Sequence, residues 1–189
     1  MKKINISDMG EFRIGSAQNK LAGTGCTVII CEEGAVAGVN VRGGSPGTRE
    51  TDALDPCNNR QSIHAVILAG GSAFGLDAAG GVMQFLEEKG VGRDVAVTKV
   101  PIVCGAILFD LKCGDYKIRP DHQMGYDACR NAYIELPAQG NIGAGTGATI
   151  GKTKGTEFAM KGGLGMACFQ VGALKVGVVI AVNCVGDIF

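Results

Sequence analysis

Clusters of glycine separate short apolar runs along most of the chain. The 189 residues include 31 glycines, which gather where one apolar run ends and the next begins. They do not recur at a fixed period, which excludes a collagen-like chain. Glycine at such junctions permits a positive φ or the close approach of another backbone or a ligand. We therefore expect short elements joined by glycine-rich turns.

Seven segments are predicted to be strands because they are short and rich in β-branched residues. They are 26–31, 35–42, 64–69, 95–103, 106–111, 166–171 and 173–183. The last two have the length and the intervening glycine of a hairpin, so adjacent antiparallel strands are expected.

Two segments show the 3.6-residue spacing of amphipathic helices. In 72–89 the apolar side chains fall on one face, Ser72 can cap the start, and Gly90 follows the end. In 121–136 an apolar stripe follows a start at Asp121. Two sheets packed face to face with helices outside would cover every apolar face, so we predict an α+β sandwich.

Charge and hydropathy exclude several classes of function. Lys+Arg and Asp+Glu each number 18, and the longest basic run is Lys2 and Lys3, so no basic surface for nucleic acid or anionic membrane is expected. The longest apolar stretch, 176–182, is far shorter than the ~18 residues of a membrane span. Residues 1–8 lack the features of a signal peptide. We expect a cytoplasmic protein, with 1–189 as a single domain.

The eight cysteines form neither a CxxC pair nor a disulfide framework, and the chain has only two histidines. A zinc site is therefore poorly supported, and we expect neither a metal nor a cofactor. Cys26 and Cys31 lie inside apolar runs, where a free thiol packs as a small apolar side chain. We expect eight free thiols.

The segment 142–153 combines a glycine run with a terminal Gly-Lys-Thr. It fails the P-loop pattern, which requires glycine where Thr146 stands, and no strand precedes it as a dinucleotide fingerprint requires. What remains is a run of close backbone N–H groups ending in Lys152, which suits a reacting carbonyl or an anion. A purely structural glycine turn is the alternative.

A serine nucleophile within this chain has little support. Ser72 lies on a strand-to-helix turn, but its surroundings do not match G-x-S-x-G, and helix capping explains the serine more simply. His64 and His122 have no acid at a spacing that indicates a Ser-His-Asp triad.

Four motifs follow one another along the chain. They are RGGSPGTRETD at 42–52, LAGGSAFGL at 68–76, GNIGAGTGATIGK at 140–152 and AVNCVGD at 181–187. Together they resemble the DmpA family of L-aminopeptidase/D-esterases, which includes β-peptidyl aminopeptidases and nylon-oligomer hydrolases. The resemblance implies an αββα sandwich of the type shared with ornithine acetyltransferases.

The resemblance also implies a precursor that cuts itself ahead of a Ser or Thr into a large α chain and a small β chain. The first residue of the β chain is then the nucleophile, and its own α-amine can serve as the base. This chain corresponds to the α chain without its linker, or to a truncated form of the protein, and is expected to be inactive alone and to bind a β chain from the same precursor. The resemblance implies αβ units that oligomerise further. The apolar run 178–189, which has no polar tail, also suggests that more polypeptide follows.

Three residues match positions that have roles in the family. Asn183 matches an asparagine whose side-chain amide stabilises the oxyanion, with an ordinary polar strand end as the alternative. Lys152 matches a lysine that nylon-oligomer hydrolases place near the nucleophile, with a solvated surface lysine as the alternative. Phe109, a substrate-binding position, stands where several relatives have tyrosine, and apolar residues surround it where the aminopeptidases have an acid. This departure weakens the expectation of aminopeptidase specificity more than that of hydrolysis.

The expected function is hydrolysis of an amide or ester in a small peptide or amide substrate, through an acyl-enzyme. Acyl transfer of the ornithine acetyltransferase type remains open, as does a non-catalytic protein that binds a ligand with its glycine loops. The substrate's identity and the choice between Ser and Thr stay open as well.

Overall fold

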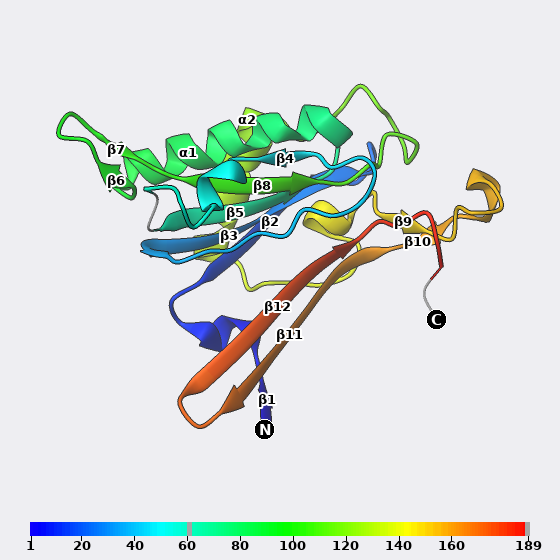
Figure 1. Ribbon diagram of the computed structural model, residues 1–189. Helices are drawn as coiled ribbons and strands as arrows, with labels where there is room; N and C mark the ends of the chain where they lie inside the picture. Colours follow the sequence, from blue (N-terminus) through cyan, green and yellow to red (C-terminus); the bar gives the residue numbers. More distant parts are fainter. Residues whose placement is uncertain (60–61, 188–189) are drawn as a thin grey trace.

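A computed structural model describes residues 1–59 and 62–187 (Figure 1). Its largest element is a five-stranded sheet in the order β2-β3-β5-β8-β4. These strands are β2 (Arg13–Asn19), β3 (Thr24–Ala35), β4 (Thr48–Arg49), β5 (Ile63–Ala69) and β8 (Val103–Ile107). Neighbouring strands are antiparallel except β5 and β8, which are parallel. The carboxyl ends of β5 and β8 therefore lie at one edge of the sheet and their amino ends at the other.

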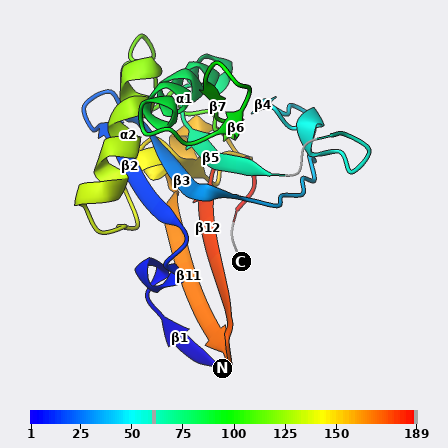
Figure 2. The same ribbon diagram turned by 90° about the vertical axis from the view of Figure 1, so that its left-hand side faces the viewer.

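Both long helices cover one face of this sheet (Figures 1 and 2). α1 (Ala78–Glu88) follows a 3-10 segment, η3 (Ser72–Asp77), and packs beside α2 (His122–Ile134). The two helices approach closely because Gly81 has no side chain: a Cβ there would collide with the backbone of His122. No helix in the described part of the chain is long and apolar enough to cross a bilayer.

A second sheet lies on the opposite side of the five-stranded sheet (Figure 1). β11 (Gly163–Val171) and β12 (Leu174–Val182) form an antiparallel hairpin that turns at Gly172 with φ +60°. β1 (Lys2–Ile4) pairs with the free edge of β11. Ala181 on β12 packs into a small core with side chains from the first sheet and the glycine run.

The remaining elements are short. They are β6 (Arg93–Asp94), β7 (Lys99–Val100), β9 (Thr149–Ile150), β10 (Met160–Lys161) and the 3-10 segments η1 (Ile6–Met9), η2 (Asp52–Leu54), η4 (Gly143–Gly145) and η5 (Thr156–Phe158).

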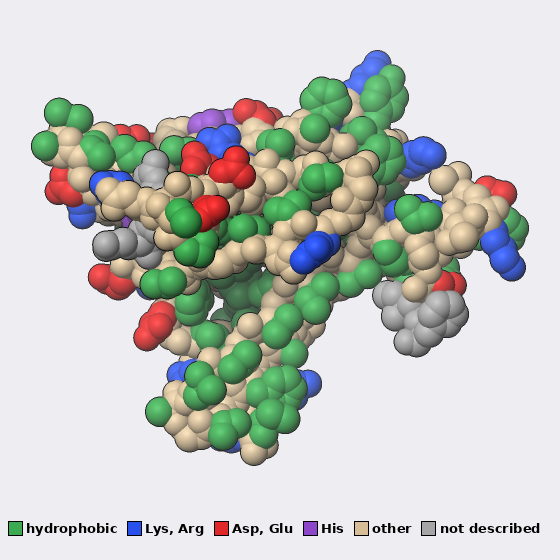
Figure 3. Space-filling view, viewed as in Figure 1, with side chains coloured by type: hydrophobic (Ala, Val, Ile, Leu, Met, Phe, Trp, Pro, Cys, Tyr) green, Lys and Arg blue, Asp and Glu red, His purple; other side chains and the backbone are tan. Residues whose placement is uncertain are grey.

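The outer face of the β11–β12 hairpin is apolar and uncovered. Alternate residues of both strands point away from the five-stranded sheet, and among the large apolar side chains that are exposed on this face the exposed fraction runs from 42% at Val178 to 64% at Leu174. Apolar side chains gather over these strands in Figure 3. The exposed members of this outer apolar face are Val171, Leu174, Val176, Val178 and Ile180. Soluble monomers seldom leave so continuous an apolar face open to water.

The structure confirms the predicted α+β sandwich with helices outside two sheets. Among the described residues both long helices lie on the same outer face, so the second helix layer of an αββα sandwich is not formed by this part of the chain. The strands predicted at 64–69, 166–171 and 173–183 correspond to β5, β11 and β12, and 26–31 lies within β3.

Three predicted strands are wrong or shifted. Beyond Ala35 the segment 35–42 leaves the sheet, after a register shift that follows Ile30. Within 95–103 only β7 and the first residue of β8 are strand. The segment 106–111 overlaps β8 only at its start, because Asp110 bonds to a neighbouring turn and draws the chain out of the sheet.

The two helix starts differ in how well sequence predicts them. Asp121 caps α2 as expected, since its Oδ1 accepts a hydrogen bond from the backbone N–H of Met124 at 2.9 Å. Ser72 does not cap its helix: its φ is +55°, and its backbone N–H donates to the carbonyl of Leu108. The cap prediction is wrong because this bond to the end of β8 fixes the turn instead.

Candidate active site

A small cavity lies where the chain that follows β8 meets the segment around β9. Its volume is about 110 Å³. The residues that line it are Phe109, Asp110, Lys112, Cys113, Thr149, Lys152, Thr156 and Ala159. Asn183, the first residue after β12, contacts two of these lining residues.

Lys152 and Asn183 are joined by a hydrogen bond. The Lys152 ammonium donates to Asn183 Oδ1 at 3.2 Å and to Thr149 Oγ1 at 3.1 Å. The backbone N–H of Thr149 also points at Asn183 Oδ1, at 3.4 Å. Because an ammonium can only donate, the atom that it contacts must be the amide oxygen. The amide NH₂ of Asn183 is then turned away from Lys152, and it donates to no other residue in 1–59 and 62–187.

The backbone fixes this pair from both sides. Lys152 N–H donates to the carbonyl of Val185 at 2.7 Å, and Gly151 N–H donates to the carbonyl of Gly186 at 2.8 Å. The segment that carries Lys152 is thus attached to the segment that follows Asn183. Two residues predicted from sequence, 31 positions apart, are held together by side-chain and main-chain bonds.

Burial lowers the pKa of Lys152, and the positive charge of Lys112 lowers it further, while the thiol of Cys184 acts in the opposite direction. Desolvation disfavours the charged form of an amine. With this lowered pKa, the Lys152 ammonium releases its proton more readily than the ammonium of a solvated lysine does. Lys152 is half-buried, and whether it acts in catalysis stays a prediction.

Phe109 and Lys152 line the same cavity. The phenyl ring is 46% exposed and has no hydrogen-bonding atom. It therefore offers an apolar surface at this position, and its role in binding a substrate stays a prediction.

Asp110 is the acid that sequence reasoning passed over. Its side chain lines the cavity but is almost entirely buried: one oxygen accepts from the backbone N–H of Gly71 at 2.6 Å and the other from Thr24 Oγ1 at 2.7 Å. Burial raises the pKa of Asp110, although both bonds act to lower it. These bonds tie the end of β8 to the turn before η3 and to the start of β3. The available signal was a single charged residue inside the apolar segment 106–111.

The glycine run 142–153 has a different role from the one predicted for its N–H groups. Ala144 N–H donates to Thr27 Oγ1 and Gly143 N–H donates to Gln18 Oε1, while the N–H groups of 145, 146 and 148 bond within the run. The Lys161 ammonium binds three carbonyl oxygens of the same run. The bonds favour the structural-turn alternative, and only the end of the run at Lys152 reaches the cavity.

Neither histidine lines this cavity. His64 lies near the amino end of β5, and His122 begins α2. Within residues 1–59 and 62–187, no group of three His, Cys, Asp or Glu side chains is placed to hold a metal ion.

The sequence profile of peptidase family S58 matches residues 5–188. An uncharacterized aminopeptidase of Mycobacterium tuberculosis (strain ATCC 25618 / H37Rv) is 44% identical over 195 residues, covering 97% of this chain and 54% of the relative. A 6-aminohexanoate-oligomer endohydrolase of Paenarthrobacter ureafaciens is 31% identical over 181 residues, covering 96% and 48%. The chain thus spans about half the length of the curated relatives it matches.

Two solved structures share the fold. The PH0078 protein from Pyrococcus horikoshii OT3 superposes with a TM-score of 0.68 at 20% identity, covering 92% of this chain and 52% of that one. A beta-aminopeptidase from Burkholderia sp. superposes with a TM-score of 0.64, also at 20% identity, covering 93% and 51%.

Proposed function

The chain belongs to peptidase family S58, and on this basis we propose that the whole protein hydrolyses an amide or ester bond through an acyl-enzyme. The observation that carries the proposal is the hydrogen-bonded pair of Lys152 and Asn183 at the cavity. The pair supplies a cation and an oriented amide donor, which are groups that stabilise a developing oxyanion.

The proposed nucleophile is the hydroxyl of an N-terminal Ser or Thr, created when the precursor cuts itself and carried by a β chain. Its own α-amine accepts the hydroxyl proton as the oxygen attacks the substrate carbonyl. The carbonyl oxygen becomes an oxyanion and accepts a hydrogen bond from the amide NH₂ of Asn183. The leaving amine or alcohol takes a proton and departs, and water then hydrolyses the acyl-enzyme.

Lys152 has two tasks in this scheme. Its ammonium holds Asn183 Oδ1, which fixes the direction of the amide NH₂ without using either of its protons. Its positive charge also favours the attacking oxygen and the oxyanion in a site where burial weakens solvent screening. Phe109 provides an apolar wall for the acyl part of the substrate.

The β chain is proposed to cover the outer apolar face of the β11–β12 hairpin. This face is open in the described residues, and the curated relatives are about twice as long as this chain. A layer of helices from the second half of the precursor would bury the face and complete an αββα sandwich. This chain alone would then be inactive, and the resulting αβ units are proposed to assemble into oligomers.

The test uses the complete gene product, purified without added protease. We expect two fragments on a denaturing gel, with Ser or Thr at the N-terminus of the smaller one, and release of amine from aminoacyl p-nitroanilides or 6-aminohexanoate oligomers. An uncut protein that hydrolyses these substrates would contradict the proposed nucleophile. Transfer of an acetyl group to an amine in preference to water would instead indicate an acyltransferase.

A further inference from the structure

Lys161, the last residue of β10, binds the main chain of the glycine run. Its ammonium donates to the carbonyl oxygens of Gly145 at 3.2 Å, Thr146 at 2.5 Å and Ala148 at 3.3 Å. An ammonium has three N–H donors, so each donor has an acceptor here. The three acceptors belong to buried residues, whereas Lys161 itself is exposed. The side chain thus folds back onto the run instead of extending into water.

β10 pairs with β9, the strand that leads to Lys152. In this antiparallel pair Lys161 stands opposite Thr149. Thr149 Oγ1 accepts a hydrogen bond from the Lys152 ammonium at 3.1 Å, and the backbone N–H of Thr149 points at Asn183 Oδ1 at 3.4 Å. The residue opposite Lys161 is therefore the one that contacts both members of the Lys152–Asn183 pair.

Gly162 brings the same segment against the end of β12. Its N–H donates to the carbonyl of Ala148 at 2.8 Å. A Cβ on Gly162 would lie 2.3 Å from the carbonyl oxygen of Val182, the residue before Asn183. Only glycine allows this approach, because a side chain would push the two segments apart. β10 therefore lies at the junction of the segments that carry Lys152 and Asn183.

The buried acid of the cavity lies beside the same run. A Cβ on Gly147 would lie 2.8 Å from Asp110 Oδ2, so the run packs directly against this carboxylate. Burial raises the pKa of Asp110, and the positive charge of Lys161 is one of the influences that lower it. Lys161 thus acts on a residue that lines the cavity, although it is not one of the lining residues itself.

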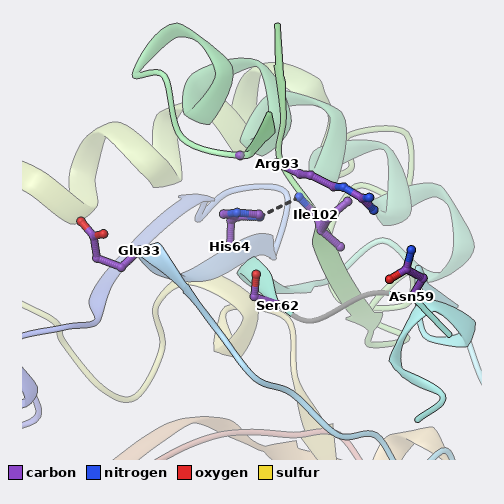
Figure 4. Close-up of a pocket in the computed structure, with 7 residues that line it drawn as sticks. Glu33, Asn59, Ser62, His64, Arg93 and Ile102 are labelled. Carbon is purple, nitrogen blue, oxygen red and sulfur yellow. Dashed lines mark hydrogen bonds between the residues drawn. The ribbon is translucent and has the colours of Figure 1, made fainter. Parts of the chain in front are cut away.

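The larger pocket near the amino ends of β5 and β8 has a different character (Figure 4). Its volume is about 380 Å³. In Figure 4 the side chains of Glu33 and Arg93 are directed away from His64, and the bond drawn is the one that Ile102 N–H donates to His64 Nδ1 at 3.1 Å. That bond joins β5 to the residue before β8. The contact of His64 thus serves the sheet, whereas the contacts of Lys161 reach the candidate active site.

We propose that Lys161 is a positioning residue of this site, whose ammonium fixes the glycine run and thereby sets the place of Lys152 relative to Asn183. The proposal rests on the hydrolase function proposed above. Three converging carbonyl oxygens suit a compact cation with donors in three directions, which an ammonium provides. The guanidinium of arginine is planar, directs its donors outward in one plane and cannot meet all three acceptors.

The first test measures turnover by Lys161→Ala in the complete gene product, per cleaved molecule. Misplacing a catalytic group by about 1 Å can cost ~100-fold in rate, so kcat should fall about 10- to 100-fold. KM should change little, because Lys161 does not line the cavity. Lys175→Ala is the matched control: the Lys175 ammonium also binds a main-chain carbonyl, that of Asp8, but near the start of β12. This variant should lose stability and keep turnover.

Propylammonium replaces the atoms that Lys161→Ala removes. Added to this variant, it should restore most of the lost kcat in a saturable manner. Tetramethylammonium has the same charge and no N–H donor, so it should restore nothing. Wild type measured with propylammonium corrects for attack of the amine on the acyl-enzyme. Lys161→Arg keeps the charge and should still have a lower kcat; it carries the same comparisons if Lys161→Ala does not fold.

A readout that needs no activity follows the titration of Lys152 by NMR in protein labelled with ¹³C-lysine, with Lys152→Arg to assign the signal. Burial lowers the pKa of Lys152, so a loosened run that admits water should raise it towards the ordinary value of 10.5. We expect this rise in Lys161→Ala and also in Lys161→Arg, which excludes loss of charge as the cause. Lys175→Ala should titrate as wild type does.

The outcomes separate the two proposals. A wild type that hydrolyses no amide or ester would refute the hydrolase function, while the titration of Lys152 would still test the role of Lys161. An unmoved Lys152 titration in either Lys161 variant would overturn that role. So would equal kcat in Lys161→Ala and Lys175→Ala, failure of propylammonium to restore kcat, or equal restoration by tetramethylammonium.

Discussion

Asn183→Asp separates the two functions that the structure gives to Asn183. The amide oxygen anchors Lys152 and the backbone N–H of Thr149, whereas the amide NH₂ is the donor proposed to meet the oxyanion. Aspartate keeps an oxygen where Oδ1 stands and replaces the donor with a second acceptor. The anchor is therefore preserved, and Lys152 gains an opposite charge that raises its pKa. Only the proposed catalytic donor is lost.

The loss of the proposed oxyanion donor sets the expected magnitude of the effect. Loss of one oxyanion donor costs ~2.7–4 kcal/mol of transition-state stabilisation, or ~100- to 1,000-fold in kcat. The added negative charge beside the oxyanion should make Asn183→Asp slower than Asn183→Ala. Asn183→Asp should nevertheless have a higher free energy of unfolding than Asn183→Ala, because only alanine removes the oxygen that anchors Lys152. Turnover by Asn183→Asp is not expected to recover at low pH, because the positive charge of Lys152 favours the ionised form of the new carboxylate.

The assay measures precursor cleavage by gel, substrate turnover by amine release and stability by urea unfolding, all in the complete gene product. Asn131→Asp is the matched control, because Asn131 uses its NH₂ to bind the carbonyl of Ser16 in the helix layer. It should lose stability and keep turnover. Wild-type cleavage and turnover in Asn183→Asp would refute the assignment of Asn183 to the site.

Asp110, Lys152 and the cysteines give three further predictions. Asp110→Asn should lower the free energy of unfolding by about 1–3 kcal/mol, because an amide cannot accept both bonds now made to the carboxylate. Since burial raises the pKa of Asp110 above its ordinary value of 3.8, the folded state binds a proton that the unfolded state has lost. The stability difference from Asp110→Asn, measured by urea unfolding, should therefore be largest at acid pH and shrink as pH rises through the raised pKa; a difference that grows would contradict this. Turnover should fall as pH rises through the lowered pKa of Lys152, and Lys152→Arg should move that limb of the profile to higher pH; an unmoved limb would assign it to another group. Thiol titration of denatured, unreduced protein should find all eight cysteines, which are unpaired in the structure, and a lower number would show a disulfide.

Local patterns predicted those elements whose determinants are local. Asp121 marks the start of α2 through a hydrogen bond to Met124, three residues further on, and Gly172 marks the turn of the β11–β12 hairpin. The approach of Lys152 to Asn183 depends on contacts between distant segments, so no spacing in the sequence reveals it. The resemblance to a family of hydrolases supplied both residues, and the structure then placed them together.

Long-range bonds explain what the sequence could not predict. Strand propensity at 106–111 continues past β8, but the buried bond between Asp110 and Gly71 turns the chain away from the sheet. The glycine run looked free to bind a ligand because its hydrogen-bond partners, Thr27 and Gln18, lie more than a hundred residues earlier. In both of these segments a polar group from a distant part of the chain decided the local conformation.

The most direct measurement is the intact mass of the protein quenched during turnover of an ester substrate. We expect a transient increase equal to the mass of the acyl group, located on an N-terminal Ser or Thr of the smaller fragment, with this chain unmodified. In Asn183→Asp the adduct should form ~100- to 1,000-fold more slowly. An acyl group on a residue of this chain, or turnover with no adduct at any quench time, would contradict the proposed N-terminal nucleophile.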